Sequence, residues 1–254
     1  MNLNLKNKIF VVSGSSKGIG FEIANQILQE GGKVVISGRN KLNLLMSFKK
    51  LSKDFDENVR YVVGDVKNES TLKKIKKILL KWKRLDGIVA NAGSVKSKNL
   101  SLNNLTDYNW YNENNFMNSF KFINYFLDYL KKNKSSIVFI SSIASIKNVG
   151  APIGYTLSKQ NINYYSKFLA KNLAKFKIRV NNVLPGNIYF KEGNWHKKIK
   201  KNKERIKKMI KKEVPLERFG TPAEIANMVI FLLSDKSSFT TGSEIIIDGG
   251  QNIN

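Results

Sequence analysis

Two side chains that can move a proton, Tyr155 and Lys159, stand four residues apart in the segment Gly-Tyr-Thr-Leu-Ser-Lys. On a helix this spacing puts both on one face, one turn apart. A lysine cation that close favours the phenolate and is expected to lower the tyrosine pKa from about 10, which suits proton exchange near neutral pH. Ser142, after the apolar run 137–140, could hydrogen-bond the oxygen that the tyrosine protonates. The competing interpretation is a half-buried tyrosine beside a solvated lysine.

A glycine-rich turn, Ser13-Gly-Ser-Ser-Lys-Gly-Ile-Gly20, follows the apolar run 8–12 and precedes a segment with helical spacing of apolar residues. Between a strand and a helix, Gly14 permits a tight bend, Gly18 lets the backbone approach a phosphate, and Gly20 lets the helix pack on the strand. The helix N-terminus then offers free N–H groups to a pyrophosphate. The turn therefore predicts a dinucleotide site, with an ordinary Gly/Ser loop as the alternative.

Seven motifs occur along the chain in a fixed order. They are the glycine turn, Asp65-Val66, Asn91-Ala92-Gly93, Asn115, the set Ser142, Tyr155 and Lys159, Pro185-Gly186, and Asp248-Gly249-Gly250. In type and order they resemble the motifs of the short-chain dehydrogenase/reductase family over nearly the whole chain, with Ser13 where the family usually has threonine. Chance is a poor explanation for seven ordered matches, and the chain is identified as a member of this family.

The resemblance implies reversible hydride transfer between a nicotinamide and a carbonyl carbon. Tyr155 would protonate the substrate oxygen, and Ser142 would hold that oxygen. Lys159 would lower the Tyr155 pKa and bind the nicotinamide ribose. Asn115 would hold a water that links Lys159 to solvent, although several neighbouring asparagines compete for this position.

The resemblance also implies the residues that contact the dinucleotide. They are Gly14, Ser16, Lys17, Gly18, Ile19, Gly20, Asp65, Val66, Asn91, Ala92, Gly93, Tyr155, Lys159, Pro185, Gly186 and Ile188. One position departs from the family pattern: Phe190 stands where a threonine commonly contacts the nicotinamide carboxamide. The backbone of Ile188 could make that contact instead.

The end of the second predicted strand, Ser37-Gly38-Arg39, bears on the choice of dinucleotide. A site for NAD(H) usually has an Asp or Glu here for the ribose hydroxyls, and this segment has none. Arg39 could pair with a 2′-phosphate, Ser37 could hydrogen-bond it, and Lys17 would add a second cation facing the same region. We therefore predict NADP(H) over NAD(H), with Arg39 as a plain surface residue being the alternative.

Composition excludes several classes of protein. The 254 residues suit one α/β domain with a sizeable core. With no cysteine and a single histidine, His196, the chain cannot form disulfides or thiolate or histidine metal clusters, and we predict no metal site. The N-terminus lacks the apolar core of a signal peptide, and no apolar run reaches the ~18–20 residues of a membrane span. We expect a cytoplasmic protein without a membrane partner.

The formal charge of +25 raises the question of a nucleic-acid partner. The lysines are spread over many segments, and Asn and Ile are abundant too, which a strongly AT-biased coding sequence would also produce. No zinc-finger spacing or recognition-helix motif accompanies them. We predict no specific nucleic-acid partner, and non-specific attraction to polyanions remains the physical alternative.

Apolar strands alternate with amphipathic helices, a pattern that predicts an α/β protein: a single-domain Rossmann fold spanning residues 1–254, with a doubly wound, seven-stranded parallel sheet and helices on both faces. The expected strands are residues 8–12, 33–37, 59–64, 87–90, 137–141, 179–184 and 244–247. The expected helices are residues 19–30, 42–53, 71–82, 107–131, 154–175 and 222–233.

The segment at about 188–214 interrupts this alternation and is dense in lysine. By resemblance to the family it would form a lid over the substrate site. A lysine-rich helix is usually a solvated face, yet a basic lid would also favour an anionic substrate or carrier.

The resemblance leaves the substrate open between a 3-oxoacyl thioester on an acidic carrier and a sugar or polyol. A non-catalytic protein that binds a dinucleotide or a polyanion is the alternative from another class, and the intact set of Asn115, Ser142, Tyr155 and Lys159 argues against it.

Family members are commonly tetramers, so we expect a homotetramer or homodimer. Candidate interface residues, each of which could equally be core, are Phe116, Phe120, Phe122, Phe126, Phe168 and Leu169.

Overall fold

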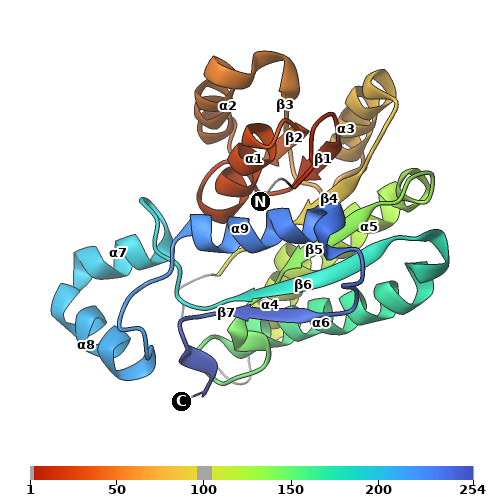
Figure 1. Ribbon diagram of the computed structural model, residues 1–254. Helices are drawn as coiled ribbons and strands as arrows, with labels where there is room; N and C mark the ends of the chain where they lie inside the picture. The colour runs from red at the N-terminus through yellow and green to blue at the C-terminus, as the bar shows by residue number, and fades with distance from the viewer. Residues whose placement is uncertain (1–2, 96–104, 254) are drawn as a thin grey trace.

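The computed structural model describes residues 3–95 and 105–253, which are built on one parallel sheet (Figure 1). The strand order is β3-β2-β1-β4-β5-β6-β7. The strands are β1 (Ile9–Val12), β2 (Lys33–Gly38), β3 (Val59–Val63), β4 (Gly87–Ala90), β5 (Ser136–Ile140), β6 (Arg179–Pro185) and β7 (Glu244–Ile247). Each differs from its predicted range by at most one residue at either end, so the doubly wound, seven-stranded fold is confirmed.

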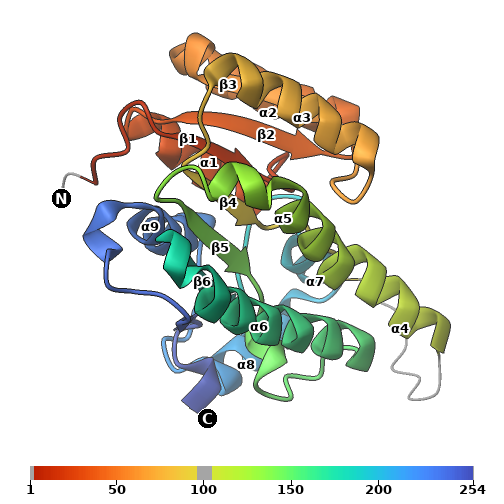
Figure 2. The same cartoon turned by 90° about the vertical axis from the view of Figure 1, so that its right-hand side faces the viewer.

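Each face of the sheet has its own apolar core, because side chains alternate along the strands. On β1, Phe10 and Val12 point to one face, and Val11 points to the other. The first face is covered by α1 (Gly18–Gln29), α2 (Lys41–Phe55) and α9 (Pro222–Leu233), and the second by α3 (Glu69–Trp82), α5 (Met117–Leu130) and α6 (Ile153–Leu173). Figure 2 views the second face, with α5 and α6 in front of the sheet.

The strand order changes direction between β1 and β4. The chain builds β2 and β3 on one side of β1 and then returns to build β4 to β7 on the other side. At the end of β1, Val12 lies between Ile36 of β2 and Val89 of β4. In open parallel sheets, ligands bind outside the carboxyl ends of the strands at this switch point. The glycine turn follows β1 there, so the fold places it at the expected ligand edge.

The helix predicted at 107–131 is interrupted. The structure has α4 (Leu105–Tyr111), a π-helical turn (Asn112–Phe116) and α5 in its place. Asparagine side chains in this turn donate hydrogen bonds to backbone carbonyls four residues earlier: Asn114 Nδ2 donates to Trp110 O at 2.8 Å, and Asn115 Nδ2 donates to Tyr111 O at 3.0 Å. Such side-chain bonds compete with the backbone ladder, which explains the local widening.

The lysine-rich segment forms two short helices, α7 (Asn194–Lys201) and α8 (Lys203–Glu213), at the left of Figure 1. Asn202 separates them and caps α8, because its side chain accepts a hydrogen bond from Arg205 N at 3.0 Å. We call residues 188–214 the lid. Within residues 3–95 and 105–253, no helix combines the length and the apolar character that crossing a membrane requires.

Candidate active site

The glycine turn is fixed to the end of β4 by hydrogen bonds. Ser13 Oγ accepts from Asn91 N and Ala92 N, each at 3.0 Å. Asn91 Nδ2 donates to Ser13 O and to Gly14 O, again at 3.0 Å. The serine that replaces the family's threonine therefore makes the contacts that join two strand ends, and the turn is a rigid platform.

Three glycines in this turn have no room for a side chain. Gly14 has φ +65°, and a Cβ there would lie 2.9 Å from Ala92 Cα. Gly18 has φ +58°, and a Cβ on Gly20 would lie 2.5 Å from Gly14 O. The α1 N-terminus begins at Gly18 without a side-chain cap, so its first N–H groups face outward. A close backbone cradle with uncapped N–H groups fits the pyrophosphate of a dinucleotide.

Arg39 lies at the end of β2 and reaches across the sheet edge. Its guanidinium donates to Asn114 Oδ1 at 3.0 Å and to Ser94 Oγ at 3.1 Å, and lies 3.9 Å from an oxygen of Asp65. More than half of the side chain is exposed, so a ligand can reach it. Ser37 corrects our expectation: it is fully buried and its hydroxyl points back to Val12 O, so it offers nothing to a phosphate.

Lys17 does not share the Arg39 environment. Its Nζ donates to Glu192 O of the lid at 3.4 Å, whereas Arg39 contacts the segments after β4. Phe190 also joins the lid to the glycine turn: a Cβ on Gly18 would lie 2.7 Å from the Phe190 ring. A dinucleotide that binds at this turn would therefore contact the Phe190 ring or displace it. The sequence identified Phe190 as a departure, but not this contact.

Tyr155 and Ser142 are brought together as the motifs predict. Tyr155 lies in the first turn of α6, and Ser142 follows β5, where its Oγ accepts a hydrogen bond from Ala144 N at 3.2 Å. Burial raises the pKa of the Tyr155 phenol above its ordinary value, and the nearby Ser142 hydroxyl opposes that shift. The protein therefore holds Tyr155 in its protonated form at neutral pH.

Lys159 lies one turn further along α6 and is only 4 % exposed. Its Nζ donates to Ile140 O at 2.8 Å and lies 5.8 Å from the centroid of the Tyr155 ring. Burial lowers the pKa of Lys159 to about 8. The expectation that Lys159 lowers the Tyr155 pKa is corrected here: burial dominates both groups, and it favours the neutral form of each.

The lowered Lys159 pKa predicts a stability that rises with pH. Between pH 8 and 10.5 the folded protein binds fewer protons at this site than the unfolded chain, so the free energy of unfolding increases through that window. Relative to Lys159→Met, the free energy of unfolding should increase by about 3 kcal/mol across this window, because each pKa unit of difference contributes about 1.4 kcal/mol. Urea unfolding of both proteins from pH 7 to 10.5 measures it. Parallel curves for the two proteins would contradict the assignment.

Asn115 is completely buried in the π-helical turn and clamps the segment after β4. Its Nδ2 donates to Ser94 O at 3.1 Å, and its Oδ1 accepts from Ser94 N at 3.0 Å. A Cβ on Gly93 would lie 2.8 Å from Asn115 Oδ1 and 3.5 Å from Lys159 Nζ. Gly93 therefore lies against both groups, and a side chain at this position would clash with the Asn115 amide.

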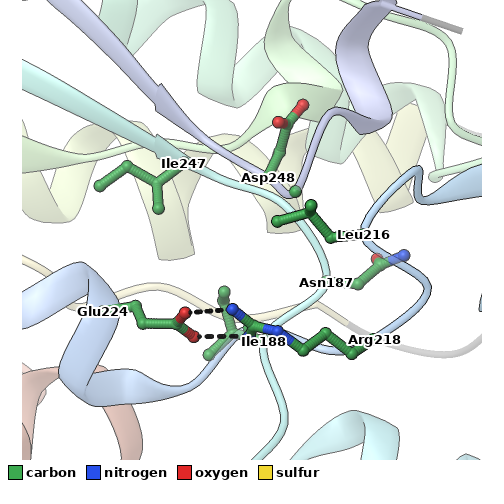
Figure 3. A pocket seen from close by; sticks show the side chains of 9 residues that line it. Asn187, Ile188, Leu216, Arg218, Glu224, Ile247 and Asp248 are labelled. Atoms are coloured by element: carbon green, nitrogen blue, oxygen red, sulfur yellow. Dashed lines mark hydrogen bonds and ion pairs between the residues drawn. The ribbon is translucent and has the colours of Figure 1, made fainter.

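Three further predicted contacts, Pro185, Gly186 and Ile188, lie at the end of β6. Gly186 packs directly on Asp248, and the backbone of Ile188 forms a parallel bridge with Gly220. A pocket of about 110 Å³ opens beside them (Figure 3). The buried Asn187 Nδ2 on its wall has no hydrogen-bond partner within residues 3–95 and 105–253, and the bidentate Arg218–Glu224 pair closes one side. The pocket can hold several waters.

The other predicted dinucleotide contacts lie on the same edge. Asp65 Oδ1 accepts from Lys67 N at 3.1 Å, and Val66 is buried in the core beside it. Ser16 lies against Gly38, and its carbonyl accepts from Ser47 Oγ at 2.7 Å. Ile19 is half-buried at the start of α1. Within the part of the chain that the structure describes, no cluster of three His, Asp or Glu side chains could hold a metal ion.

Comparison with known proteins agrees with this arrangement. The family described as enoyl-(acyl carrier protein) reductase matches residues 14–252. The chain is 32% identical over 252 residues to the 3-oxoacyl-[acyl-carrier-protein] reductase FabG of Chlamydia muridarum, covering 98% of this chain and 99% of that protein. It is also 32% identical over 262 residues to the L-xylulose reductase of Caenorhabditis elegans, covering 98% and 97%.

Among solved structures, the L-sorbose reductase of Gluconobacter frateurii, complexed with NADPH and L-sorbose, superposes with a TM-score of 0.92 at 25% identity and covers 100% of both chains. Relatives with different substrates thus share one fold and full length with this protein. The chain belongs to the short-chain dehydrogenase/reductase family and is an NAD(P)-dependent oxidoreductase.

Proposed function

We propose that this single-domain protein reduces a carbonyl compound with NADPH, through Tyr155, Ser142, Lys159 and Asn115. The proximity of Tyr155 and Ser142 carries this proposal, because a protonated phenol and a hydroxyl come to one point. That point is reached from the same sheet edge as the glycine turn. A carbonyl oxygen placed there would accept hydrogen bonds from both side chains.

When bound, the nicotinamide supplies a hydride to the carbonyl carbon. As negative charge grows on the substrate oxygen, Ser142 donates a hydrogen bond to it and Tyr155 transfers its phenolic proton. Lys159 is tied to Ile140 O and can also donate to the ribose hydroxyls. With a pKa of about 8, its ammonium can release a proton near neutral pH and help to return one to Tyr155. Asn115 fixes the backbone that follows Gly93, and it would hold the water that links Lys159 to solvent.

Arg39 supports NADP(H) as the dinucleotide, since a 2′-phosphate could replace Asn114 and Ser94 as hydrogen-bond acceptors of the guanidinium. Arg39→Leu is expected to lower kcat/KM for NADPH by roughly 10- to 100-fold, because hydrogen bonds to charged groups contribute about 1.5–3 kcal/mol. The value for NADH should change little. Arg60→Leu on β3, whose guanidinium binds the backbone at Asp56, is the matched control. Equal use of NADH and NADPH by the unmodified enzyme would refute the preference.

The lid favours a substrate on an acidic carrier. Ten basic residues and two glutamates lie in residues 194–213, and the lysines among them are exposed. Such a surface attracts an acidic protein and increases its rate of association. The FabG relatives bear the name of a reaction on an acyl carrier protein. We therefore propose a 3-oxoacyl thioester as the first candidate substrate.

Reversing the lid charges tests this candidate. Lys197, Lys198, Lys200 and Lys201 changed together to Glu should raise KM for a carrier-linked acetoacetyl group by roughly tenfold or more. KM for a short acetoacetyl thioester without carrier should stay unchanged. The same reversal at the exposed Lys73, Lys74, Lys76 and Lys77 of α3 alters net charge equally and serves as control. Equal effects of the two sets would contradict a carrier site on the lid.

A sugar is the second candidate substrate, supported by the relatives named as L-xylulose and L-sorbose reductases. In the lid, Tyr189 OH and His196 Nδ1 are hydrogen-bonded at 2.9 Å, and Trp195 packs on Phe219 with ring centroids 5.3 Å apart. These groups could line a polar pocket. Comparing kcat/KM for acetoacetyl thioesters, keto-sugars and small diketones with NADPH separates the candidates. Turnover of keto-sugars alone would reject the carrier-linked substrate.

We also propose that the protein assembles as a homotetramer or homodimer. Exposed apolar side chains lie along α6 at Leu157, Tyr164 and Phe168, which share one helix face. Among the residues expected at an interface, Phe122, Phe126 and Leu169 are buried in the core of the single chain, whereas Phe168 is 55% exposed. Light scattering at micromolar concentration tests the assembly, and a monomer would refute it.

A further inference from the structure

Asn163 continues the line of Tyr155 and Lys159 along α6. The three residues follow one another at intervals of four, so all lie on one face of the helix. Asn163 is 7% exposed and faces the short 3-10 turn Ile143–Ser145, which follows Ser142 directly. An amide at this depth must find hydrogen-bond partners, because leaving it unpaired costs about 1–3 kcal/mol.

Its partners form a chain that ends on Ser142. Asn182 Nδ2 donates to Asn163 Oδ1 at 2.8 Å, and Asn163 Nδ2 donates to Ser145 Oγ at 2.8 Å. Ser145 Oγ then donates to Ser142 O at 2.6 Å. All the linking side chains are buried. The chain thus joins β6 and α6 to the turn after β5 and ends on the main-chain carbonyl of Ser142.

The direction of these bonds is fixed by chemistry. The carbonyl of Ser142 can only accept, so the Ser145 hydroxyl must give its proton there. Ser145 Oγ can then only accept from Asn163, which must turn its NH₂ group toward it. This leaves Asn163 Oδ1 toward β6, where Asn182 supplies the donor. A hydrophobic or purely accepting residue at Asn163 could not complete this sequence.

We propose that Asn163 is a positioning residue for Ser142. Acting through Ser145, it holds the main chain of Ser142 at a fixed distance from the helix that carries Tyr155 and Lys159, and Asn182 orients its amide. This inference rests on the proposed reductase function insofar as Ser142 holds the substrate oxygen. The backbone bonds within the turn, Ser145 N to Ser142 O and Ile146 N to Ile143 O, shape the turn itself. The residues just before Ser142 are tied to α6 separately, by Ser141 Oγ to Lys159 O at 3.1 Å and by Lys159 Nζ to Ile140 O at 2.8 Å, and the Asn163 link adds a tie to the turn that follows Ser142.

A double-mutant cycle on turnover tests the role. Asn163→Leu is expected to lower kcat by roughly 10- to 100-fold, the effect of a misplaced group near the reacting atoms. NADPH affinity should be unchanged, since the glycine turn is not touched. In a Ser142→Ala background the same change should alter kcat by less than about twofold, because the group being positioned is already gone. An equal fall in both backgrounds would show a general structural effect and overturn the proposal.

Asn181→Leu is the matched control. Asn181 is the chain neighbour of Asn182, is equally buried, and bonds Thr240 O and Ser243 N beside β7. It should reduce stability while kcat of the folded protein stays within about twofold. If Asn163→Leu does not fold, Ser145→Ala breaks the same chain at its next link and should reproduce the loss of kcat.

Amide hydrogen exchange tests the same inference without measuring catalytic activity. Amides of residues 143–147 should exchange at least about tenfold faster in Asn163→Leu or Ser145→Ala than in the unmodified protein, because the turn loses its tie to α6. Asn181→Leu should leave them unchanged. Unchanged exchange in the first two variants would overturn the positioning role. Absence of any turnover in the unmodified protein, with the exchange difference present, would instead reject the proposed function and leave the tie established.

Discussion

Tyr155→Phe is expected to lower turnover by about 10²- to 10⁴-fold, the range in which positioned general acids contribute. The phenol lies beside Ser142, and burial keeps it protonated by raising its pKa, so the variant loses the proton that the substrate oxygen needs. The ring and its edge-on packing against Tyr111 are kept. Affinity for NADPH should therefore stay within about twofold while kcat collapses.

Tyr165→Phe provides the control for this result. Tyr165 lies on the same helix, its hydroxyl accepts from Asn124 Nδ2 at 2.8 Å, and burial raises its pKa to about 12. The Tyr165→Phe variant also loses a phenolic oxygen, but at a site away from Ser142, so kcat should be nearly unchanged. Steady-state kinetics and NADPH titration of both variants measure the contrast. Near-normal turnover by Tyr155→Phe would show that another group donates the proton.

Gly20→Ala is expected to weaken NADPH binding by roughly 10- to 100-fold, because relieving an overpacked contact typically costs about 1–3 kcal/mol. The new methyl group would lie 2.5 Å from Gly14 O and would also meet the Asn91 amide. Both belong to the platform that fixes the turn, so α1 would have to move away from it. The N–H groups at the start of α1 would move with the helix and would no longer point toward the pyrophosphate.

Gly150→Ala separates this contact from a general loss of stability. Gly150 has φ +67°, so alanine is strained there, but apart from the adjoining residues no atom of the described part of the chain lies within 4 Å of the added methyl group. This variant should lose some stability and bind NADPH normally. Fluorescence titration with NADPH and thermal unfolding give both quantities. Normal NADPH affinity in Gly20→Ala would mean that the dinucleotide does not use this turn.

The strands could be predicted closely because buried parallel strands are short apolar runs with polar ends. The glycine turn and the Asn91-Ala92-Gly93 motif could be placed beside the switch point for the same reason, since alternating strands and helices predict a doubly wound sheet. The interruption between α4 and α5 could not, because it depends on which carbonyls the Asn114 and Asn115 amides find. Asparagines in a helical pattern predict lower stability, but not a π-helical turn.

Within the candidate site, the meeting of Tyr155 with Ser142 followed from the motifs, whereas the electrostatics did not. Spacing places Lys159 beside Tyr155, but burial decides both pKa values, and burial is a property of the whole fold. Ser37 fails for the same reason, because a strand-end hydroxyl can point inward as easily as outward. The Asn182–Asn163 bond joins residues 19 apart in the chain, and no local pattern reveals such a pair.

Phe190 shows how one substitution links two segments. Read from the sequence, it removes a hydroxyl that the resemblance would place at the carboxamide. In the folded protein its ring rests on Gly18, and the neighbouring Glu192 O accepts from Lys17. The lid and the glycine turn therefore meet, so we expect the lid to respond when the dinucleotide binds.

The most direct test of the account follows the hydride itself. NADPH labelled with deuterium at C4 of the nicotinamide is incubated with the unmodified enzyme and each carbonyl compound of the panel, and the product is examined by mass spectrometry. We predict that one deuterium appears on the new alcohol carbon of at least one product, and that the label is nearly absent with Tyr155→Phe. Tight binding of NADPH, with no deuterium transferred to any carbonyl compound of the panel, would contradict the proposed carbonyl reductase.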